Sequence, residues 1–268
     1  MRRRLLISFL LFVFGAFFYP ENFDKTGNIF DLNKLYYDID FASDIKFLDG
    51  KILIRDYEKG KKADDYIVFQ EKVELVYESK IPFLRFPNGN KYLILANSDL
   101  CILYDKSDNK PKCFGTNLGN GSELIDYIDK NLVVATSELK EGSTLFRASN
   151  IATLNINEPW VEGQKDYGIG EEIQFKGNCS YIYIFNGFVS YNKPYLYENN
   201  ARIKKIEISF PEEENRNPIV WTLNDTPNPQ KINLGKRCNS IIKIKILDIY
   251  EGTKYRDTCL NGIIFKVY

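Results

Sequence analysis

Apolar and polar residues alternate in short runs from about residue 27 to the C-terminus. In residues 204–210, KKIEISF, three apolar residues share one side of an extended chain, while Glu207 and Ser209 take the other. Residues 241–246, IIKIKI, repeat the pattern with isoleucines and lysines. A period of two is typical of a strand with one buried face. We therefore predict a mainly all-β fold.

The C-terminal half contains eight such runs and no convincing helical run. Strands that each bury one face, without helices to cover them, pack most simply as two sheets face to face. We therefore predict a β-sandwich domain over residues 134–268. The runs are EIQF, SYIYIF, GFVSY, KKIEISF, PIVWTL, QKINL, SIIKIKILDIY and GIIFKVY.

The N-terminal half has its own β pattern. Between residues 27 and 115, runs such as KVELVYE, IPFLRF and KYLILAN alternate with the polar turns EKGKKADD, FPNGNK and KSDNKPK. They predict a meander or small antiparallel sheet, in a β-rich domain over residues 21–115 whose function no motif reveals. Residues 116–133 form the predicted linker, where SELIDYIDKNL has a serine N-cap and helical spacing of its apolar residues and predicts a short helix.

The first 20 residues predict export. Three arginines precede an apolar run from Leu5 to Phe18, which is too short for a comfortable membrane span and is typical of a signal peptide. Phe14 stands where a small residue usually precedes the cleavage site, so an uncleaved N-terminal anchor is the alternative. We expect a secreted, periplasmic or cell-envelope protein with no membrane span beyond this segment.

The composition excludes several classes of function. Lys plus Arg and Asp plus Glu each total 36, so no positive excess is available to follow a nucleic-acid backbone. The chain has no histidine, which excludes Ser-His-Asp and Cys-His catalysis and most catalytic zinc sites. The glycine-containing loop of residues 163–170 precedes a strand rather than a helix, so it does not predict a dinucleotide site. We predict no cofactor and no metal.

Five cysteines leave the disulfide pattern open. An exported protein can form disulfides, but an odd number leaves at least one thiol free or paired with another chain. Cys101 and Cys113 flank a turn and are candidates to staple a hairpin. The alternative is that some cysteines are small buried apolar residues.

Several blocks occur together in the C-terminal half: ATSELKEG, WVEG, GIGE, FNGFVS, YENNARIKK, TLNDTPNPQKINL and DIYEGTKYRDTC. In order and spacing they resemble the discoidin-like, F5/8 type C domain named after the translocation domain of an NAD glycohydrolase toxin, over about residues 134–268. The resemblance implies a galactose-binding-like jelly-roll β-sandwich that binds carbohydrate. The NAD-cleaving activity of the toxin belongs to a different domain, which no segment here resembles.

Two positions depart from the family pattern. Ala152 and Thr153 stand where members usually have an Asp-Gly turn in a loop that helps to hold a structural calcium, which puts that calcium site in doubt. Glu158 stands before Pro159, where threonine is frequent, so the rim of the sandwich is expected to differ there.

Six residues are our candidates for a ligand-binding rim. Trp160 and Glu162 lie two residues apart and point to one side if extended, which suits stacking on a sugar ring and hydrogen bonding to its hydroxyls. Asn199 and Arg202 supply amide and guanidinium donors at the start of a strand. Each has a structural alternative: Trp160 as a core residue, Glu162 as a turn cap, and Asn199 and the neighbouring lysines as turn and solvent-facing residues. The remaining candidates are Tyr255 and Asp257.

We therefore predict an exported, non-catalytic bacterial protein that binds a glycan through loops at one end of the sandwich. The alternative is an envelope protein-interaction or structural module. A third hypothesis is a hydrolase in which Glu162 and Asp257 act as an acid and base pair. The family resemblance favours binding over this catalysis, so we do not predict an enzyme.

Overall fold

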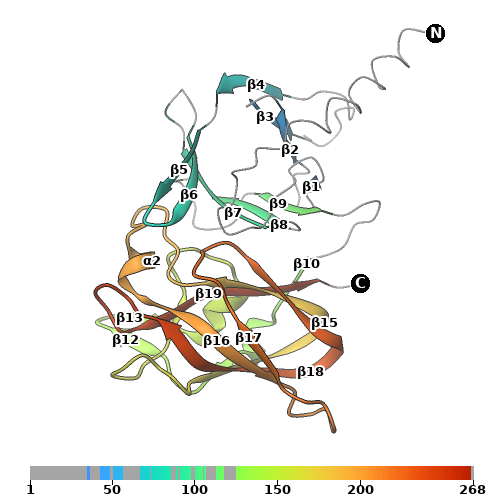
Figure 1. Ribbon diagram of the computed structural model, residues 1–268, viewed down its shortest axis with the longest axis vertical. Helices are drawn as coiled ribbons and strands as arrows, with labels where there is room; N and C mark the ends of the chain where they lie inside the picture. Colours follow the sequence, from blue (N-terminus) through green and yellow to red (C-terminus); the bar gives the residue numbers. More distant parts are fainter. Residues whose placement is uncertain are drawn as a thin grey trace, which may run out of the picture.

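The computed structural model describes residues 35–36, 43–48, 51–56, 67–72, 74–85, 89, 91–97, 100–104, 106, 113–117 and 125–266 (Figure 1). The predicted signal or anchor segment, residues 1–20, lies outside these ranges. Residues 118–124 of the predicted linker also lie outside them. The domain boundaries remain predictions. In the part of the chain that the structure describes, no helix has the length and hydropathy to cross a membrane.

Antiparallel strands make up the described part of the N-terminal half. Six of them form one sheet, in the order β1-β9-β8-β7-β6-β5, and three form a second sheet, β2-β3-β4. The consecutive pairing from β5 to β9 is the meander that the sequence predicts. The strands are β1 (Leu35–Tyr36), β2 (Ser43–Leu48), β3 (Lys51–Asp56), β4 (Ile67–Lys72), β5 (Glu74–Glu78), β6 (Ile81–Arg85), β7 (Lys91–Ala96), β8 (Leu100–Tyr104) and β9 (Cys113–Asn117).

The C-terminal half is the predicted jelly-roll sandwich. Its main sheet has the order β10-β19-β15-β18-β16-β17, and a parallel pairing of β16 with β19 closes that sheet on itself. The elements are β10 (Ile125–Tyr127), η2 (Lys130–Leu132), β11 (Val134–Ala135), β12 (Leu139–Glu141), β13 (Thr144–Phe146), η3 (Ala148–Ala152), β14 (Trp160–Val161), β15 (Glu172–Asn186), α2 (Leu196–Asn199), β16 (Ala201–Ser209), β17 (Ile219–Thr222), β18 (Gln230–Tyr250) and β19 (Thr258–Lys266).

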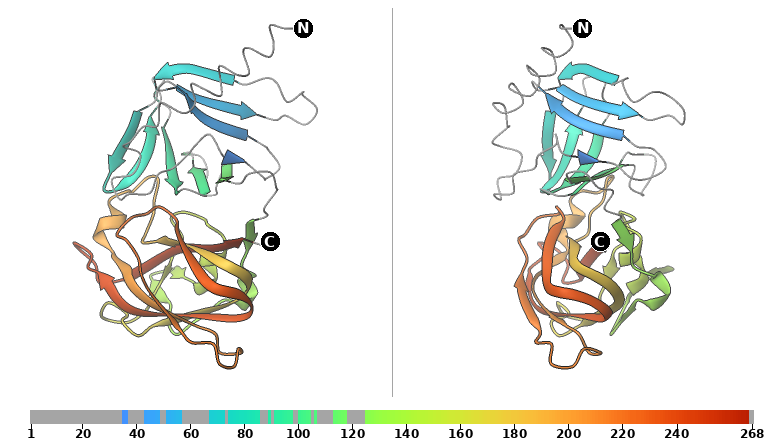
Figure 2. Two further views of the ribbon diagram at one scale, coloured as in Figure 1. Left: turned by 45° about the vertical axis from the view of Figure 1, so that its right-hand side comes forward. Right: turned by 90° about the vertical axis from the view of Figure 1, so that its right-hand side faces the viewer.

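Two long strands make the two layers continuous. β15 contains both EIQF and SYIYIF, and β18 contains both QKINL and SIIKIKILDIY. Each of these two long strands therefore combines two of the strands predicted from the sequence. Their antiparallel ladder has a register shift between Cys179 and Tyr181, where an irregularity bends the pair. The single ladder therefore passes from one layer of the sandwich to the other (Figure 2).

Two predicted elements are absent. Residues 125–127 form strand β10, which pairs with β19, so the helix predicted over SELIDYIDKNL is wrong there; only Lys130–Leu132 forms one 3-10 turn. The open edge of β19 offers residues 125–127 backbone partners that a helix in isolation lacks. GFVSY is not a strand either. Its Val189 is buried in the contact with the N-terminal half, which explains the apolar pattern.

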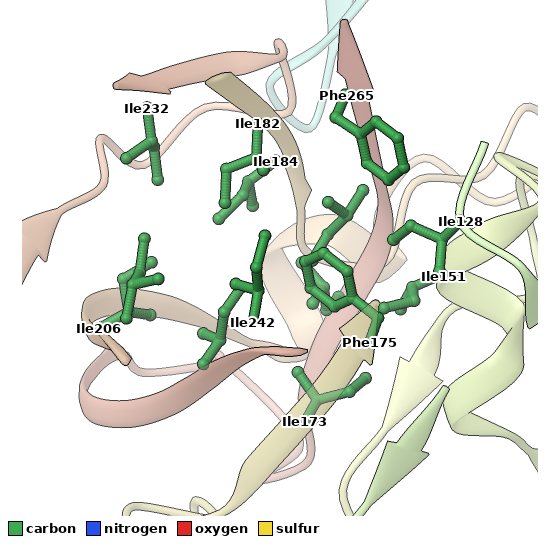
Figure 3. Close-up of a cluster of buried hydrophobic side chains, with 14 of the residues drawn as sticks. Ile128, Ile151, Ile173, Phe175, Ile182, Ile184, Ile206, Ile232, Ile242 and Phe265 are labelled. Carbon is green, nitrogen blue, oxygen red and sulfur yellow. The ribbon is translucent and has the colours of Figure 1, made fainter. Parts of the chain in front are cut away.

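The sandwich closes around an isoleucine-rich core. Side chains from β15, β16, β18 and β19 alternate inward, as the period-two pattern predicts, and they point toward one another between the layers (Figure 3). The 3-10 helix η3 and strand β14 cover one side of this core with the side chains of Ile151 and Trp160. Labelled members include Ile173, Phe175, Ile182, Ile184, Ile206, Ile232, Ile242 and Phe265.

A second core joins the two halves. The six-stranded N-terminal sheet lies over the sandwich (Figures 1 and 2) and shares a buried cluster with it. The Tyr104 hydroxyl donates to the Leu154 carbonyl at 2.9 Å, and the Tyr191 hydroxyl donates to the Lys91 carbonyl at 2.6 Å. The cluster contains Ile81, Phe83, Leu93, Leu95, Ile102 and Tyr104 from the sheet, and Leu154, Ile156, Tyr183, Phe185, Val189, Tyr191, Tyr197 and Ile264 from the sandwich.

The shared core predicts that the halves unfold together. Phe83 is fully buried, and its ring meets the Tyr191 ring edge-on at 5.4 Å between centroids. We expect Phe83→Ala to lower the free energy of unfolding by about 3–5 kcal/mol, because it leaves a cavity between the halves. Both tryptophans, Trp160 and Trp221, belong to the C-terminal half, so urea unfolding followed by tryptophan fluorescence reports that half.

The control is Tyr77→Ala, which truncates an aromatic side chain that is half exposed. It should move the fluorescence midpoint much less than Phe83→Ala. An unchanged midpoint in Phe83→Ala would show that the sandwich folds independently of the sheet.

Candidate functional site

A pocket of about 250 Å³ opens at one end of the sandwich. It lies where the β12–β13 hairpin, the segment from β15 to α2 and the β18–β19 loop come together, on the side of Figure 1 where α2, β12 and β13 are labelled. Loops that gather at one end of a rigid sandwich are free to vary without disturbing its core. The pocket is lined by Leu139, Glu141, Phe146, Val161, Phe188, Lys193, Leu196, Asn200, Tyr255 and Asp257.

Part of the pocket wall is aromatic. The rings of Phe146 and Phe188 meet edge-on, with centroids 6.0 Å apart and planes at 71°. The Tyr255 side chain is 38% exposed, and the Lys254 ammonium lies 4.9 Å from the centre of its ring. An exposed tyrosine ring and two half-buried phenylalanine rings offer flat apolar surface to a ligand.

The other part of the wall is polar and carries both signs of charge. Glu141 and Lys193 are exposed, Asp257 is half-buried, and Asn200 is buried. Burial raises the pKa of Asp257 above its usual value. The Asn200 amide nitrogen donates to the Leu196 carbonyl at 2.8 Å. Two carboxylates, an ammonium and an amide can together accept from and donate to a ligand that has many hydroxyl groups.

The end of α2 holds the loop that carries Tyr255. The Lys254 and Tyr255 amides both donate to the Asn199 carbonyl, at 3.1 and 2.7 Å, and the Thr253 amide donates to the Glu198 carbonyl at 2.9 Å. At Gly252, an added Cβ would lie 2.4 Å from the Asn199 and Tyr255 carbonyl oxygens, so only glycine fits. The loop is therefore fixed by its backbone before any ligand arrives.

Arg202 connects the end of α2 to the β18–β19 loop through buried hydrogen bonds. Its side chain is buried, and its Nε and Nη2 donate to the two carboxylate oxygens of Asp225 at 3.0 and 2.9 Å. Its Nη1 donates to the carbonyls of Asn200 at 2.8 Å and Glu251 at 3.1 Å. One guanidinium thus holds together α2's C-terminal end and the start of the β18–β19 loop.

Lys80 connects this arrangement to the N-terminal half. It lies in the turn between β5 and β6, and its ammonium contacts the Asp225 carboxylate at 2.7 Å. Burial by itself would raise the pKa of Asp225, but the hydrogen bonds from Arg202 and Lys80 outweigh it and lower that pKa. Asp225 is therefore held ionised between two cations.

Trp160 lies in the core next to the pocket and does not line it. Its side chain is fully buried in the sandwich core, and its indole nitrogen donates to the Ser137 carbonyl at 2.9 Å, two residues before β12. Pairing of β14 with β19 turns Trp160 inward. The neighbouring Val161 lines the pocket.

Glu162 is also fully buried. One carboxylate oxygen accepts from the Gln164 amide at 2.7 Å and the other from the Thr258 amide at 3.2 Å. Gly168 has a φ of +63° and packs so closely that a Cβ there would lie 2.4 Å from the Glu162 Cγ. Burial raises the pKa of Glu162 to about 7, against the lowering effect of these amides. Glu162 therefore joins the loop of residues 163–170 to the start of β19.

The structure separates the six predicted rim residues. Tyr255 and Asp257 line the pocket. The structure buries three of the others, Trp160, Glu162 and Arg202, so their predicted placement on the rim is corrected. Trp160 is a core residue and Glu162 caps a turn, which were the structural alternatives. The Arg202 guanidinium donates to Asp225 and to backbone carbonyls. Asn199 supports the Tyr255 loop through its carbonyl, and its side chain accepts from the Thr253 hydroxyl at 3.1 Å.

Sequence reasoning missed most of the pocket. Phe188, Leu139, Glu141 and Asn200 lie in the blocks FNGFVS, ATSELKEG and YENNARIKK, which carry the family resemblance, but no periodicity marks them as pocket residues. Phe146, Lys193 and Leu196 lie outside those blocks. Across residues 125–266 and the described strands before them, no group of three or more acidic or cysteine side chains is placed to hold a metal ion.

Glu162 predicts a pH-dependent stability. Its folded pKa of about 7 lies above the ordinary 4.5, so between these values the folded protein holds a proton that the unfolded chain has released. The resulting stabilisation is complete below pH 4.5 and is lost as the pH rises through 7. We expect the free energy of unfolding to fall by about 3 kcal/mol over this window because of Glu162.

Glu162→Gln should remove this part of the pH dependence, although the variant is less stable overall because its NH₂ group faces a backbone amide. The measurement is urea unfolding at several pH values between 4.5 and 8, with the exposed Glu158→Gln as control. A slope in Glu162→Gln equal to that of the wild type would contradict the assignment.

The two cations on Asp225 should contribute unequally. Arg202→Ala removes a buried guanidinium, leaves the half-buried Asp225 carboxylate with Lys80 as its remaining cation and leaves backbone carbonyls unpaired, so we expect a loss of about 3 kcal/mol in unfolding free energy. Lys80→Ala removes a half-exposed partner, and we expect a loss within about 1 kcal/mol. Chemical denaturation of both variants checks this, and equal losses would refute the ranking.

Comparisons with known proteins identify a family for the C-terminal half. A family model for the NAD glycohydrolase translocation F5/8 type C domain matches residues 127–266. No curated protein sequence matches the chain. Among solved structures, the family 32 CBM from C. perfringens NanJ in complex with galactose is 18% identical with a TM-score of 0.39, covering 54% of this chain and 100% of that one.

The arabinofuranosyltransferase AftD from mycobacteria is 11% identical with a TM-score of 0.37, covering 66% of this chain and 14% of that one. The family match spans more than half of the 268 residues and includes the sandwich from the last residue of β10 onward. The chain therefore belongs to the family of the NAD glycohydrolase translocation F5/8 type C domain.

Proposed function

We propose that the protein is an exported, non-catalytic glycan-binding protein and that the pocket at the end of the sandwich takes one sugar ring. The observation that carries this proposal is the composition of the pocket: aromatic side chains from two loops and a hairpin beside carboxylate, amide and ammonium groups. Membership of the F5/8 type C family is consistent with such binding.

The chemistry of the pocket walls matches a saccharide. One face of a pyranose carries mostly C–H groups and packs on an aromatic ring, here Tyr255, Phe146 or Phe188. The ring hydroxyls both donate and accept, so they can donate to the Asp257 carboxylate and accept from Lys193. Because the pocket carries both signs of charge, it favours a hydroxyl-rich ligand over a strongly charged one.

The size of the pocket limits the ligand. Pockets for drug-sized molecules span roughly 300–1,000 Å³. A pocket of about 250 Å³ suits a terminal or single projecting sugar, with the rest of the glycan outside. The loops around it are held by backbone hydrogen bonds and by Arg202, so little conformational freedom is lost on binding.

Binding without turnover fits the position of Glu162. The hydrolase hypothesis pairs Glu162 with Asp257, and that pairing requires both carboxylates to reach the sugar. Both Glu162 oxygens accept from backbone amides, and the side chain is fully buried. This supports recognition rather than hydrolysis by that pair.

The test is a glycan array probed with the full chain without its first 20 residues, followed by calorimetry with the best ligand. We expect Tyr255→Ala to weaken binding about tenfold or more, because an exposed aromatic anchor is lost. Trp221→Ala is a matched control, since Trp221 is 36% exposed against 38% for Tyr255 and lies on β17, outside the pocket lining. The control should bind as the wild type does.

A uniformly silent array at high protein concentration would reject the proposal and favour an envelope protein-interaction module. Equal loss of binding in both variants would also reject the pocket as the binding site.

A further inference from the structure

Two cysteines of the sandwich lie directly opposite each other. Cys179 in β15 and Cys238 in β18 are partners in the antiparallel ladder. Their side chains are 2% and 0% exposed, and both belong to the same core cluster, so they point to the same face of the sheet. Partners on one face of an antiparallel pair have Cβ atoms roughly 4.5–5.5 Å apart.

The two sulfur atoms also lean toward the same end of the ladder. The Cys238 Sγ lies 3.2 Å from the Ser240 hydroxyl oxygen, two residues further along β18. The Cys179 Sγ lies 3.4 Å from the place that a Cβ on Gly177 would occupy, two residues back along β15. Gly177 is the ladder partner of Ser240. Both sulfurs are therefore displaced toward the level of Gly177, where the Ile242 side chain fills the space that a side chain on Gly177 would occupy.

The structure has both cysteines as free thiols, at opposite ladder positions whose typical spacing is near that of a disulfide. Disulfide-bonded cysteines have Cα atoms roughly 4.4–6.8 Å apart and Cβ atoms roughly 3.5–4.5 Å apart. Opposite ladder positions meet the first range and need only a small approach to meet the second. The register shift between Cys179 and Tyr181 provides local freedom for that approach.

The other cysteines lack this arrangement. Cys259 has Val161 as its antiparallel partner and Arg202 as its parallel partner. In the β8–β9 ladder, Cys101 is opposite Gly115 and Cys113 is opposite Leu103. The two cysteines predicted as a possible hairpin disulfide are therefore two positions apart along the ladder and are not direct partners.

We propose that Cys179 and Cys238 form a cross-strand disulfide that fastens the two long strands beside their bend. The two thiols lose two protons and two electrons as the S–S bond forms. A small-molecule disulfide such as oxidised glutathione accepts the electrons and is cleaved to two thiols, through a mixed disulfide with one of the cysteines.

Burial explains when this bond must form. Burial raises the pKa of the Cys179 thiol to about 12 and also raises that of Cys238, so the reactive thiolate is scarce once the core has closed. The oxidation therefore belongs to folding, before β15 and β18 are sealed. The same burial shields the finished bond from reductants.

The test is peptide mapping of the full chain without its first 20 residues, refolded in a glutathione redox buffer. Free thiols are alkylated in denaturant, and the protein is digested and analysed by mass spectrometry without reduction. We expect a linked pair of peptides that contain Cys179 and Cys238, lighter by two hydrogens than the separate peptides, and an alkylated Cys259. Alkylation of both Cys179 and Cys238, or either one linked to a different cysteine, would overturn the proposal.

A second measurement, the melting temperature of the wild type with and without reductant, does not depend on whether a variant folds. Reductant present throughout refolding should lower the melting temperature of the wild type by about 5 °C or more. The Cys179→Ala/Cys238→Ala double variant should be insensitive to reductant, and Cys259→Ala should keep the wild-type sensitivity. A wild-type melting temperature unchanged by reductant would contradict a stabilising bond at this place.

Discussion

The buried guanidinium of Arg202 is the interaction on which the candidate site depends. It binds both oxygens of Asp225 and the carbonyls of Asn200 and Glu251, so the end of α2 and the start of the β18–β19 loop meet at one charged group. Arginine suits this position because its planar fork satisfies a carboxylate and several carbonyls at once and stays charged when buried. The pocket loops lie on this fixed base.

The N-terminal sheet belongs to the same structural unit. Its inner face shares a buried cluster with the sandwich, and Lys80 reaches the Asp225 carboxylate that Arg202 holds. Packed side chains and one ion pair therefore connect the sheet to the elements that support the pocket. A β-rich half with no chemical motif of its own has a clear physical role here, which is to cover an apolar face of the sandwich that water would otherwise contact.

The WVEG block shapes the pocket mainly from the interior of the fold. Trp160 fills the core and fixes Ser137 ahead of the β12–β13 hairpin, Val161 reaches the pocket, and Glu162 ties two loops through backbone amides. Aromatic and acidic residues at this spacing suggest a sugar site from composition alone. Pairing of β14 with β19 turns them inward, and residues of the surrounding loops and hairpin supply most of the pocket lining.

Alternation in the sequence was enough to determine the all-β class, the meander strands and the inward residues of β16 and β18, because period two follows directly from strand geometry. Of the six residues predicted for the rim at one end of the sandwich, Tyr255 and Asp257 line the pocket. Tertiary structure alone decided that residues 125–127 pair with β19, that Trp160, Glu162 and Arg202 face inward, and that Phe146, Phe188 and Lys193 meet Tyr255. These outcomes depend on partners far away in the chain, and no local pattern of residues records which distant backbone edge or side chain will be adjacent.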